Sequence, residues 1–267
     1  SALRRKLLSD HQFLEIHCFP QKDDSANRVF EEAKLSTCVY ILQKRNSTVT
    51  FNVYFYPGKY FDNGDNYAID RQIISEIDPE GCSVPMVSDS ALRLVKKLSD
   101  NRVYSKFDDC GDIFPGEVML NTQFVRYISD APTDTLLLRG AHIGRYEFNQ
   151  EPKQGSPKYL YRALYLQESR HDSKAYHHKF QRIGFQRGAA VDNWRRLIGT
   201  ILPVDVFLTD TVGYILIKKP FSIWFALALF QSQLLEWRFG LVSATNHVNA
   251  YEVRILPLRR ISFTTPA

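Results

Sequence analysis

Hydrophobic and polar positions alternate most regularly between residues 48 and 56. Val49, Phe51 and Val53 fall on one side of an extended chain, and polar or tyrosine side chains fall on the other. This period of two predicts a strand with one buried face. The apolar run 36–42 predicts a second buried strand. Shorter apolar runs predict further strands at 13–19, 111–118, 135–140, 180–185, 194–202, 204–208, 214–217 and 256–258.

Helical spacing is strongest over 222–239, where apolar residues recur every three to four positions. The stripe consists of Ile223, Leu227, Phe230, Leu234 and Trp237. The pattern predicts one continuous helix, with Ser222 as its N-cap and Gly240 as a left-handed C-terminal cap. A shorter helix is predicted over 90–98, capped near Ser88.

We expect an α+β fold. With 267 residues, the chain is long enough for one large domain or two small ones. The turn-rich segment 62–66 is the candidate boundary, which gives domains of residues 1–61 and 62–267.

Charge divides the chain unequally. Residues 139–267 hold 18 Lys and Arg against 9 Asp and Glu, a net charge of +9, whereas residues 1–138 hold 16 against 20, a net charge of −4. A basic half of this kind indicates contact with a polyanion such as nucleic acid. A solvated basic surface without a ligand is the alternative.

Four scattered cysteines without a C-x-x-C pair are typical of reduced thiols in a cytosolic protein, so we expect a cytoplasmic location. The longest apolar run, 223–230, is too short to cross a bilayer, so no membrane association is expected. The start of the sequence resembles neither a signal peptide nor an initiation site, and we expect a fragment of a longer polypeptide.

No complete catalytic motif is recognisable. The chain contains neither a dinucleotide-binding glycine pattern nor a phosphate-binding loop. His171, His177 and His178 lie close together in sequence, but no cysteine or suitably spaced carboxylate joins them, so no metal site is predicted.

Basic residues of the second half lie among tyrosines and Trp194, a mixture that suits nucleic acid. Arginine binds phosphates and guanine edges, and asparagine suits adenine edges. The candidate DNA-binding residues are Arg139, His142, Arg145, Arg187, Arg195, Arg196, Asn246, His247 and Asn249. For the two asparagines, capping of their own loop is an equal alternative.

Several segments, in order along nearly the whole chain, resemble Taq-type adenine-N6 DNA methyltransferases and restriction enzymes that fuse nuclease, methyltransferase and specificity parts. Residues 3–5, the strand that ends at Phe19 and residues 29–39 resemble the end of the methyltransferase domain, and later segments resemble the C-terminal target recognition domain. The later segments are 111–114, 116–118, 138–143, 207–211, 228–235, 246–248 and 256–258.

The resemblance implies a role in methyl transfer from S-adenosylmethionine to an adenine flipped out of duplex DNA. The catalytic and cofactor motifs of the family are expected outside this chain, so the fragment alone is expected to bind no cofactor and to be inactive. Phe30 matches the family aromatic that stacks on the flipped base, and Lys34 follows it as a candidate DNA contact. A core phenylalanine at the start of a strand is the alternative for Phe30.

The sequence thus predicts the last strands of a methyltransferase α/β domain followed by an α+β target recognition domain. The expected partners are double-stranded DNA and the remainder of the parent methyltransferase or restriction polypeptide. The alternatives are a free-standing metal-dependent nuclease and a basic protein-interaction module.

Overall fold

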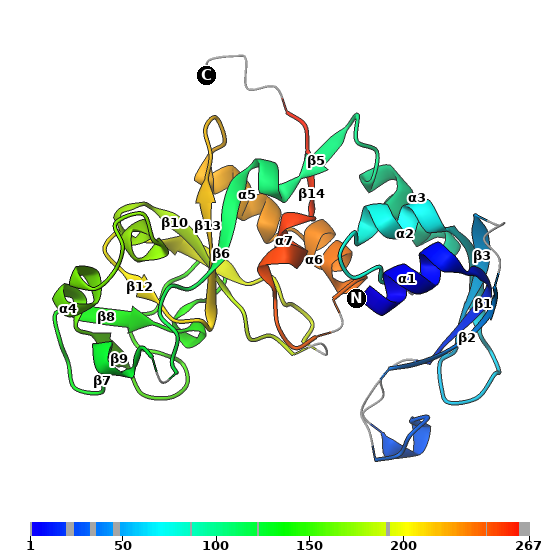
Figure 1. The fold of residues 1–267 in the computed structure, drawn as a ribbon, viewed down its shortest axis with the longest axis horizontal. Helices are drawn as coiled ribbons and strands as arrows, with labels where there is room; N and C mark the ends of the chain where they lie inside the picture. The colour runs from blue at the N-terminus through cyan, green and yellow to red at the C-terminus, as the bar shows by residue number, and fades with distance from the viewer. Residues whose placement is uncertain are drawn as a thin grey trace. The chain divides into compact units, whose positions relative to one another are not determined.

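The computed structural model describes residues 2–19, 24–32, 36–44, 49–85, 87–121, 123–190, 193–243 and 245–261. They form an α+β fold, as predicted (Figure 1). The chain forms two compact units, Ser1–Val103 and Tyr104–Ala267. This division lies well beyond the expected boundary at residues 61 and 62, because the strand Asp65–Asp70 pairs with Thr50–Phe55.

The first unit is built on one sheet with the strand order β2-β1-β3-β4. Its elements are α1 (Ala2–Asp10), β1 (Gln12–Phe19), η1 (Ser25–Asn27), β2 (Thr37–Gln43), β3 (Thr50–Phe55), β4 (Asp65–Asp70), α2 (Arg71–Ile77) and α3 (Asp89–Leu98). Strands β1 and β3 are parallel, and the other two neighbouring pairs are antiparallel. The three helices gather on one side of the sheet (Figure 1).

The alternating pattern has the expected effect within β3, whereas Val49, which was predicted on the buried face, precedes the strand and is 58% exposed. Phe51 and Val53 are buried, and Asn52 between them is exposed. Helix α3 begins where predicted, and the Ser88 hydroxyl accepts a hydrogen bond from the Ala91 amide at 3.4 Å.

Strand β2 corrects the prediction of a buried strand. It lies at the edge of the sheet, and its central side chains Val39, Tyr40 and Ile41 are each nearly half exposed. An apolar run does not reveal whether a strand has one neighbour or two, and here the described neighbour is β1 alone.

The second unit contains three sheets in its described part, with the orders β11-β10-β13-β6, β12-β8-β9-β7 and β14-β5. Its strands are β5 (Tyr104–Lys106), β6 (Gly111–Pro115), β7 (Ile128–Ser129), β8 (Thr135–Leu138), β9 (Lys158–Leu160), β10 (Arg182–Gln186), β11 (Gly199–Leu202), β12 (Phe207–Leu208), β13 (Val212–Ile217) and β14 (Pro257–Arg259). Its helices are η2 (Phe107–Asp109), η3 (Val125–Tyr127), η4 (Gly140–His142), α4 (Arg162–Gln167), η5 (Lys174–Lys179), α5 (Ile223–Phe230), α6 (Gln233–Gly240) and α7 (Ala250–Arg254).

The core of this unit lies where α5 and α6 pack against the β10–β13 sheet. Phe185, Ile215, Leu227, Phe230 and Phe239 are all at most 3% exposed and belong to one apolar cluster. None of the helices in the described ranges is long and apolar enough to cross a membrane.

The predicted single helix over 222–239 is wrong, because the chain breaks between α5 and α6. The Ser232 hydroxyl accepts a hydrogen bond from the Leu235 amide at 3.2 Å and begins the second helix. Gly240 is the last helical residue and does not have a positive φ, so it is not the predicted left-handed cap. Ser222 occupies the N-cap position but makes no side-chain capping bond.

Candidate nucleic-acid interface

Four loop segments of the second unit meet to form what we call the loop cluster. The segments are 143–148, 186–190, 193–199 and 245–249. The first is tied to the third by a hydrogen bond of 3.0 Å from the Tyr146 amide to the Gly199 carbonyl. It is tied to the second by the Gln186 side chain, which donates to the Ile143 carbonyl at 2.6 Å. Residues far apart in sequence are therefore brought to one place.

The second and fourth segments run side by side, joined by an antiparallel bridge between Gly188 and His247. The Ala189 amide donates to the Asn246 carbonyl at 3.0 Å, and the Val248 amide donates to the Arg187 carbonyl at 2.8 Å. These backbone bonds fix the position from which the side chains at 246 and 247 project.

Most of the exposed side chains of the cluster suit contact with nucleic acid, and its exposed carboxylate, Glu147, is paired with Lys153 Nζ at 3.0 Å. Arg145, Asn246 and His247 are exposed, Tyr146 is 52% exposed and Trp194 is 81% exposed. The Arg145 guanidinium lies 5.2 Å from the centre of the Tyr146 ring, so a cation and an aromatic face are presented together. Such a surface can neutralise phosphates and stack on bases.

Arg187 and Arg139 are half-buried, and each is anchored at one nitrogen. Arg187 Nη1 donates to the Asp210 carbonyl at 2.6 Å, and Arg139 Nη1 donates to the Ser156 carbonyl at 3.0 Å. A guanidinium carries five N–H donors, so these bonds to described residues leave capacity for further contacts. Both stay candidate DNA contacts.

Arg195 and Arg196, by contrast, lie in the interior, which corrects their prediction as contact residues. They are 5% and 3% exposed. Arg195 Nη1 donates to the Gln231 carbonyl at 2.9 Å. Arg196 donates to the carbonyls of Ser243, Thr245 and His247, and therefore holds the 245–249 segment from beneath.

His142 is also interior, with 0% of its surface exposed, and has no face for a ligand. Its Nδ1 lies 2.9 Å from the Arg139 amide, from which it accepts a hydrogen bond. Burial lowers the pKa of the imidazole, which favours the neutral ring. The residue stabilises the turn after β8 and is corrected from a DNA contact to a structural residue.

Asn249 takes the loop-capping role that the sequence left open. It is the N-cap residue of α7, and Glu252 Oε2 accepts hydrogen bonds from the Asn249 amide at 2.8 Å and from its Nδ2 at 3.0 Å. Glu252 is 3% exposed, so the pair is turned inward. The side chains of Asn246 and His247 are the ones that reach the surface.

Phe30 belongs to the first unit and lies in the connection between η1 and β2. It is 61% exposed, so it is not the core phenylalanine of the alternative interpretation. Its stacking role stays a prediction. Lys34 lies outside the described residues.

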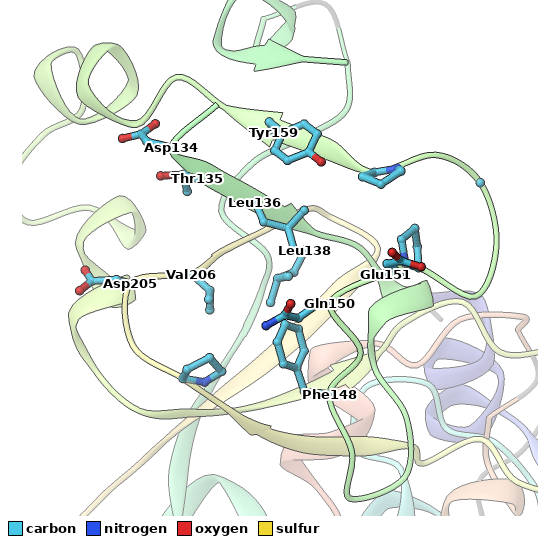
Figure 2. Close-up of a pocket in the computed structure, with 14 residues that line it drawn as sticks. Asp134, Thr135, Leu136, Leu138, Phe148, Gln150, Glu151, Tyr159, Asp205 and Val206 are labelled. Carbon is cyan, nitrogen blue, oxygen red and sulfur yellow. The ribbon is translucent and has the colours of Figure 1, made fainter. Parts of the chain in front are cut away.

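A hollow of about 800 Å³ opens beside the loop cluster, between β8, β9 and the 203–206 connection, and shares Phe148 with the cluster (Figure 2). Leu136, Leu138, Phe148 and Val206 line it, together with the carboxylates of Asp134, Glu151 and Asp205. Among the described residues that line it, none is Lys or Arg. Its charge is the wrong sign for phosphate, so it is not part of the candidate interface.

The three clustered histidines have structural partners, and the His171 ring packs against Tyr176 with the ring centres 5.0 Å apart. His177 Nδ1 lies 2.8 Å from the Tyr214 hydroxyl, and His178 Nδ1 lies 2.9 Å from Asp205 Oδ1. In the described part of the chain, no group of three or more His, Cys, Asp or Glu side chains could hold a metal ion.

The sequence placed the tyrosines and Trp194 in the basic and aromatic mixture of the second half, but Tyr146 and Trp194 were not among the candidate contact residues. Each is adjacent to an arginine, as Arg145–Tyr146 and Trp194–Arg195. This adjacency is the signal in the sequence that could have identified them, because the local pattern of residues does not reveal which side chains are exposed.

Comparisons with known proteins return little. No family model matches the chain. No curated protein matches it. A solved structure titled "Characterization and crystal structure of the type IIG restriction endonuclease BpuSI" is similar with a TM-score of 0.43 and 12% sequence identity. The alignment covers 97% of this chain and 38% of the endonuclease chain, so this sequence spans less than two fifths of that protein.

Proposed function

We propose that residues 104–267 bind double-stranded DNA as the target recognition part of an adenine-N6 DNA methyltransferase of a restriction-modification system. The observation that carries the proposal is the loop cluster, which presents Arg145, Tyr146, Trp194, Asn246 and His247 from three separate segments. The cluster is fixed by backbone hydrogen bonds, and DNA readers use such rigid supports to position side chains against bases.

The packing of the segments that resemble the methyltransferase family also supports the proposal, because several of these segments contact one another and so belong to one scaffold. The Val118 amide donates to the Leu208 carbonyl, and the Thr209 amide donates to the Leu138 carbonyl. A Cβ on Gly116 would lie 2.0 Å from the Thr209 carbonyl oxygen, so glycine is required at that contact.

In this proposal the chain recognises DNA and the parent polypeptide supplies the chemistry. No residue of the sequence is assigned to catalysis or to S-adenosylmethionine. Phe30 would support the flipped adenine through its exposed ring, as an aromatic face does for an extruded base.

The first test is binding of the 267-residue chain to labelled duplex DNA, measured by fluorescence anisotropy over a range of salt. We expect log affinity to fall linearly with log salt, with a slope of about −0.9 for each phosphate neutralised. Arg145→Ala should weaken binding and reduce the magnitude of this slope by about 1. Arg170→Ala is the matched control, since Arg170 is 84% exposed and lies outside the loop cluster.

Binding that is indifferent to salt would rule out the proposed DNA contact. Cleavage of plasmid DNA that depends on an added divalent metal would favour the nuclease alternative instead. For Phe30, the test is Phe30→Ala in the parent polypeptide, with methyl transfer and 2-aminopurine fluorescence both measured. An unchanged rate and unchanged fluorescence would remove its stacking role.

A further inference from the structure

Trp194 has the most exposed of the large apolar side chains in the described residues, at 81%. An indole of this size normally gains several kcal/mol from burial, roughly 25 cal/mol for each Å² removed from water. Leaving it in solvent forgoes that stabilisation. The ring is therefore available to a ligand that would cover it.

The ring is supported from inside by a buried cation. The Arg195 guanidinium lies 5.2 Å from the centre of the Trp194 ring, and the Arg195 side chain is 4% exposed. Its Nη1 donates to the Gln231 carbonyl at 2.9 Å and lies 3.9 Å from Glu236 Oε2. The cation is thereby fixed to the junction of α5 and α6.

The backbone that follows Trp194 is fixed by the same carboxylate. The amides of Arg196 and Leu197 donate to Glu236 Oε1 and Oε2, each at 2.8 Å. Charge-assisted bonds of this kind are among the stronger ones in proteins. An exposed aromatic on a rigid support loses little conformational entropy when a ligand binds, whereas a mobile side chain would lose more.

The surroundings of Trp194 indicate what that ligand is. Its segment joins the Arg145–Tyr146 loop through the Gly199 carbonyl. On its other side, the Asn193 amide donates to the Ala190 carbonyl, one residue beyond the Ala189 bond to Asn246. Trp194 thus belongs to a loop cluster whose other exposed groups are mostly cationic, amide or aromatic, and whose exposed carboxylate, Glu147, is paired with Lys153 at 3.0 Å. This combination favours a nucleobase with its phosphates over an apolar protein side chain.

We infer that Trp194 is a stacking platform for a nucleobase that has left its place in the duplex or belongs to a single strand. This inference rests on the proposed function and adds a ligand contact distinct from the one proposed for Phe30. Arg195 is a positioning residue, because it acts through the ring it supports.

The direct test uses Trp194 as its own reporter. The chain has three tryptophans, so Trp224→Phe with Trp237→Phe leaves Trp194 as the only indole. Stacking on a base quenches indole emission, so titration with DNA should quench it strongly at saturation. Separate arms with intact duplex, duplex containing an abasic site and single-stranded oligonucleotide identify whether the base comes from a distorted duplex or from a free strand.

The second readout is affinity. Trp194→Ala should weaken DNA binding by about 5- to 150-fold, the range for loss of one base–aromatic stack. The salt slope should not change, because no charge is removed. Trp194→Phe should retain most of the affinity, and Trp224→Ala, which removes another exposed indole, should match the unmodified chain.

These experiments distinguish failure of the stacking role from failure of the proposed function. Salt-dependent DNA binding with unchanged Trp194 emission, and with Trp194→Ala at the unmodified affinity, would overturn the stacking role and leave the proposed function intact. Absence of any DNA binding would remove both.

Discussion

Arg196 contacts four backbone carbonyls from the interior of the second unit. Its Nε donates to Ala189 at 3.3 Å, its Nη1 to Ser243 at 3.2 Å, and its Nη2 to Thr245 and to His247. A planar guanidinium can satisfy several acceptors at fixed angles, whereas an ammonium acts as a point donor. The residue therefore determines the shape of the candidate interface without touching its ligand.

We expect Arg196→Met to lower the free energy of unfolding by at least about 2 kcal/mol, because buried carbonyls lose charge-assisted partners. DNA affinity should fall as well, since the 245–249 segment loses its support. Arg196→Lys should retain little of the lost stability or of the lost DNA affinity. Urea unfolding measures the first effect and anisotropy the second, with Arg145→Ala as the control that removes an exposed charge and leaves stability within about 0.5 kcal/mol.

Glu117 and Arg182 form an ion pair in which both side chains are 0% exposed. Arg182 Nη1 lies 3.2 and 3.3 Å from the two carboxylate oxygens, and its Nη2 donates to the Val206 carbonyl at 2.7 Å. The guanidinium carbon also lies 4.7 Å from the centre of the Tyr214 ring. Desolvation raises the pKa of the Glu117 carboxyl, although the neighbouring arginine opposes the shift.

Removal of one partner should be costly, because the other charge stays buried without compensation. Glu117→Gln and Arg182→Met should each destabilise the chain by about 3 to 5 kcal/mol. The double variant Glu117→Leu with Arg182→Met should be closer to the unmodified chain than either single variant. Additive losses in denaturant unfolding would show that the two residues act independently.

At the scale of elements, the break between α5 and α6 decides which side chains reach the core. In α6 the buried residues are Leu235, Arg238 and Phe239, and the expected stripe residue Leu234 is 41% exposed. The Gln231 side chain donates to the Gly199 carbonyl at 2.6 Å, which ties the break to β11. The periodicity continues across residues 231 and 232, so it could not reveal that the helix stops and restarts.

The Ser232 cap predicts a measurable difference between two serines that occupy N-cap positions. Ser232→Ala should cost about 0.5 to 2 kcal/mol of stability, since the Leu235 amide loses its acceptor. Ser222→Ala is the matched control, because Ser222 makes no side-chain capping bond. Equal effects on the midpoint of urea unfolding would contradict the assignment of the cap.

Sequence patterns predicted those elements whose signal is local. Strand β3 followed from alternation, and α3 followed from its Ser88 cap and apolar spacing. The exposure of β2 and the burial of Arg195 and Arg196 depend on which distant segments pack against them, and composition treats every arginine as a surface charge. The loop cluster is likewise formed by tertiary hydrogen bonds between residues far apart in sequence, such as Val248 and Arg187, which no local pattern encodes.

At the scale of the whole molecule, the net positive charge is carried by the second unit. Residues 104–267 hold 20 Lys and Arg against 15 Asp and Glu, a net of +5, whereas residues 1–103 hold 14 of each. Arg182, Arg195, Arg196 and Arg238 are buried, and two buried carboxylates, Glu117 and Glu252, oppose them. The positive field that DNA would meet is therefore produced by fewer residues than the sequence count implied.

Buried histidines make the second unit sensitive to acid. Burial is the largest cause of the lowered pKa of His142, His177 and His178, so the folded state favours each neutral ring. Below the ordinary value of 6.5, the unfolded chain binds protons that the folded chain does not, and stability therefore falls as pH falls. The hydrogen bond to His178 lowers the pKa of Asp205, so stability falls further when this carboxylate is protonated in a more acidic range. The raised pKa of Glu117 has the opposite effect on stability.

We expect the free energy of unfolding to decrease as pH is lowered from about 7.5 to about 5, by roughly 1.4 kcal/mol for each pKa unit by which a histidine is depressed. His142→Gln should flatten this dependence even where it lowers stability at neutral pH, because the variant has no imidazole to protonate. The measurement is urea unfolding across the pH range for both proteins. Parallel curves for the two would show that His142 is not a source of the acid sensitivity.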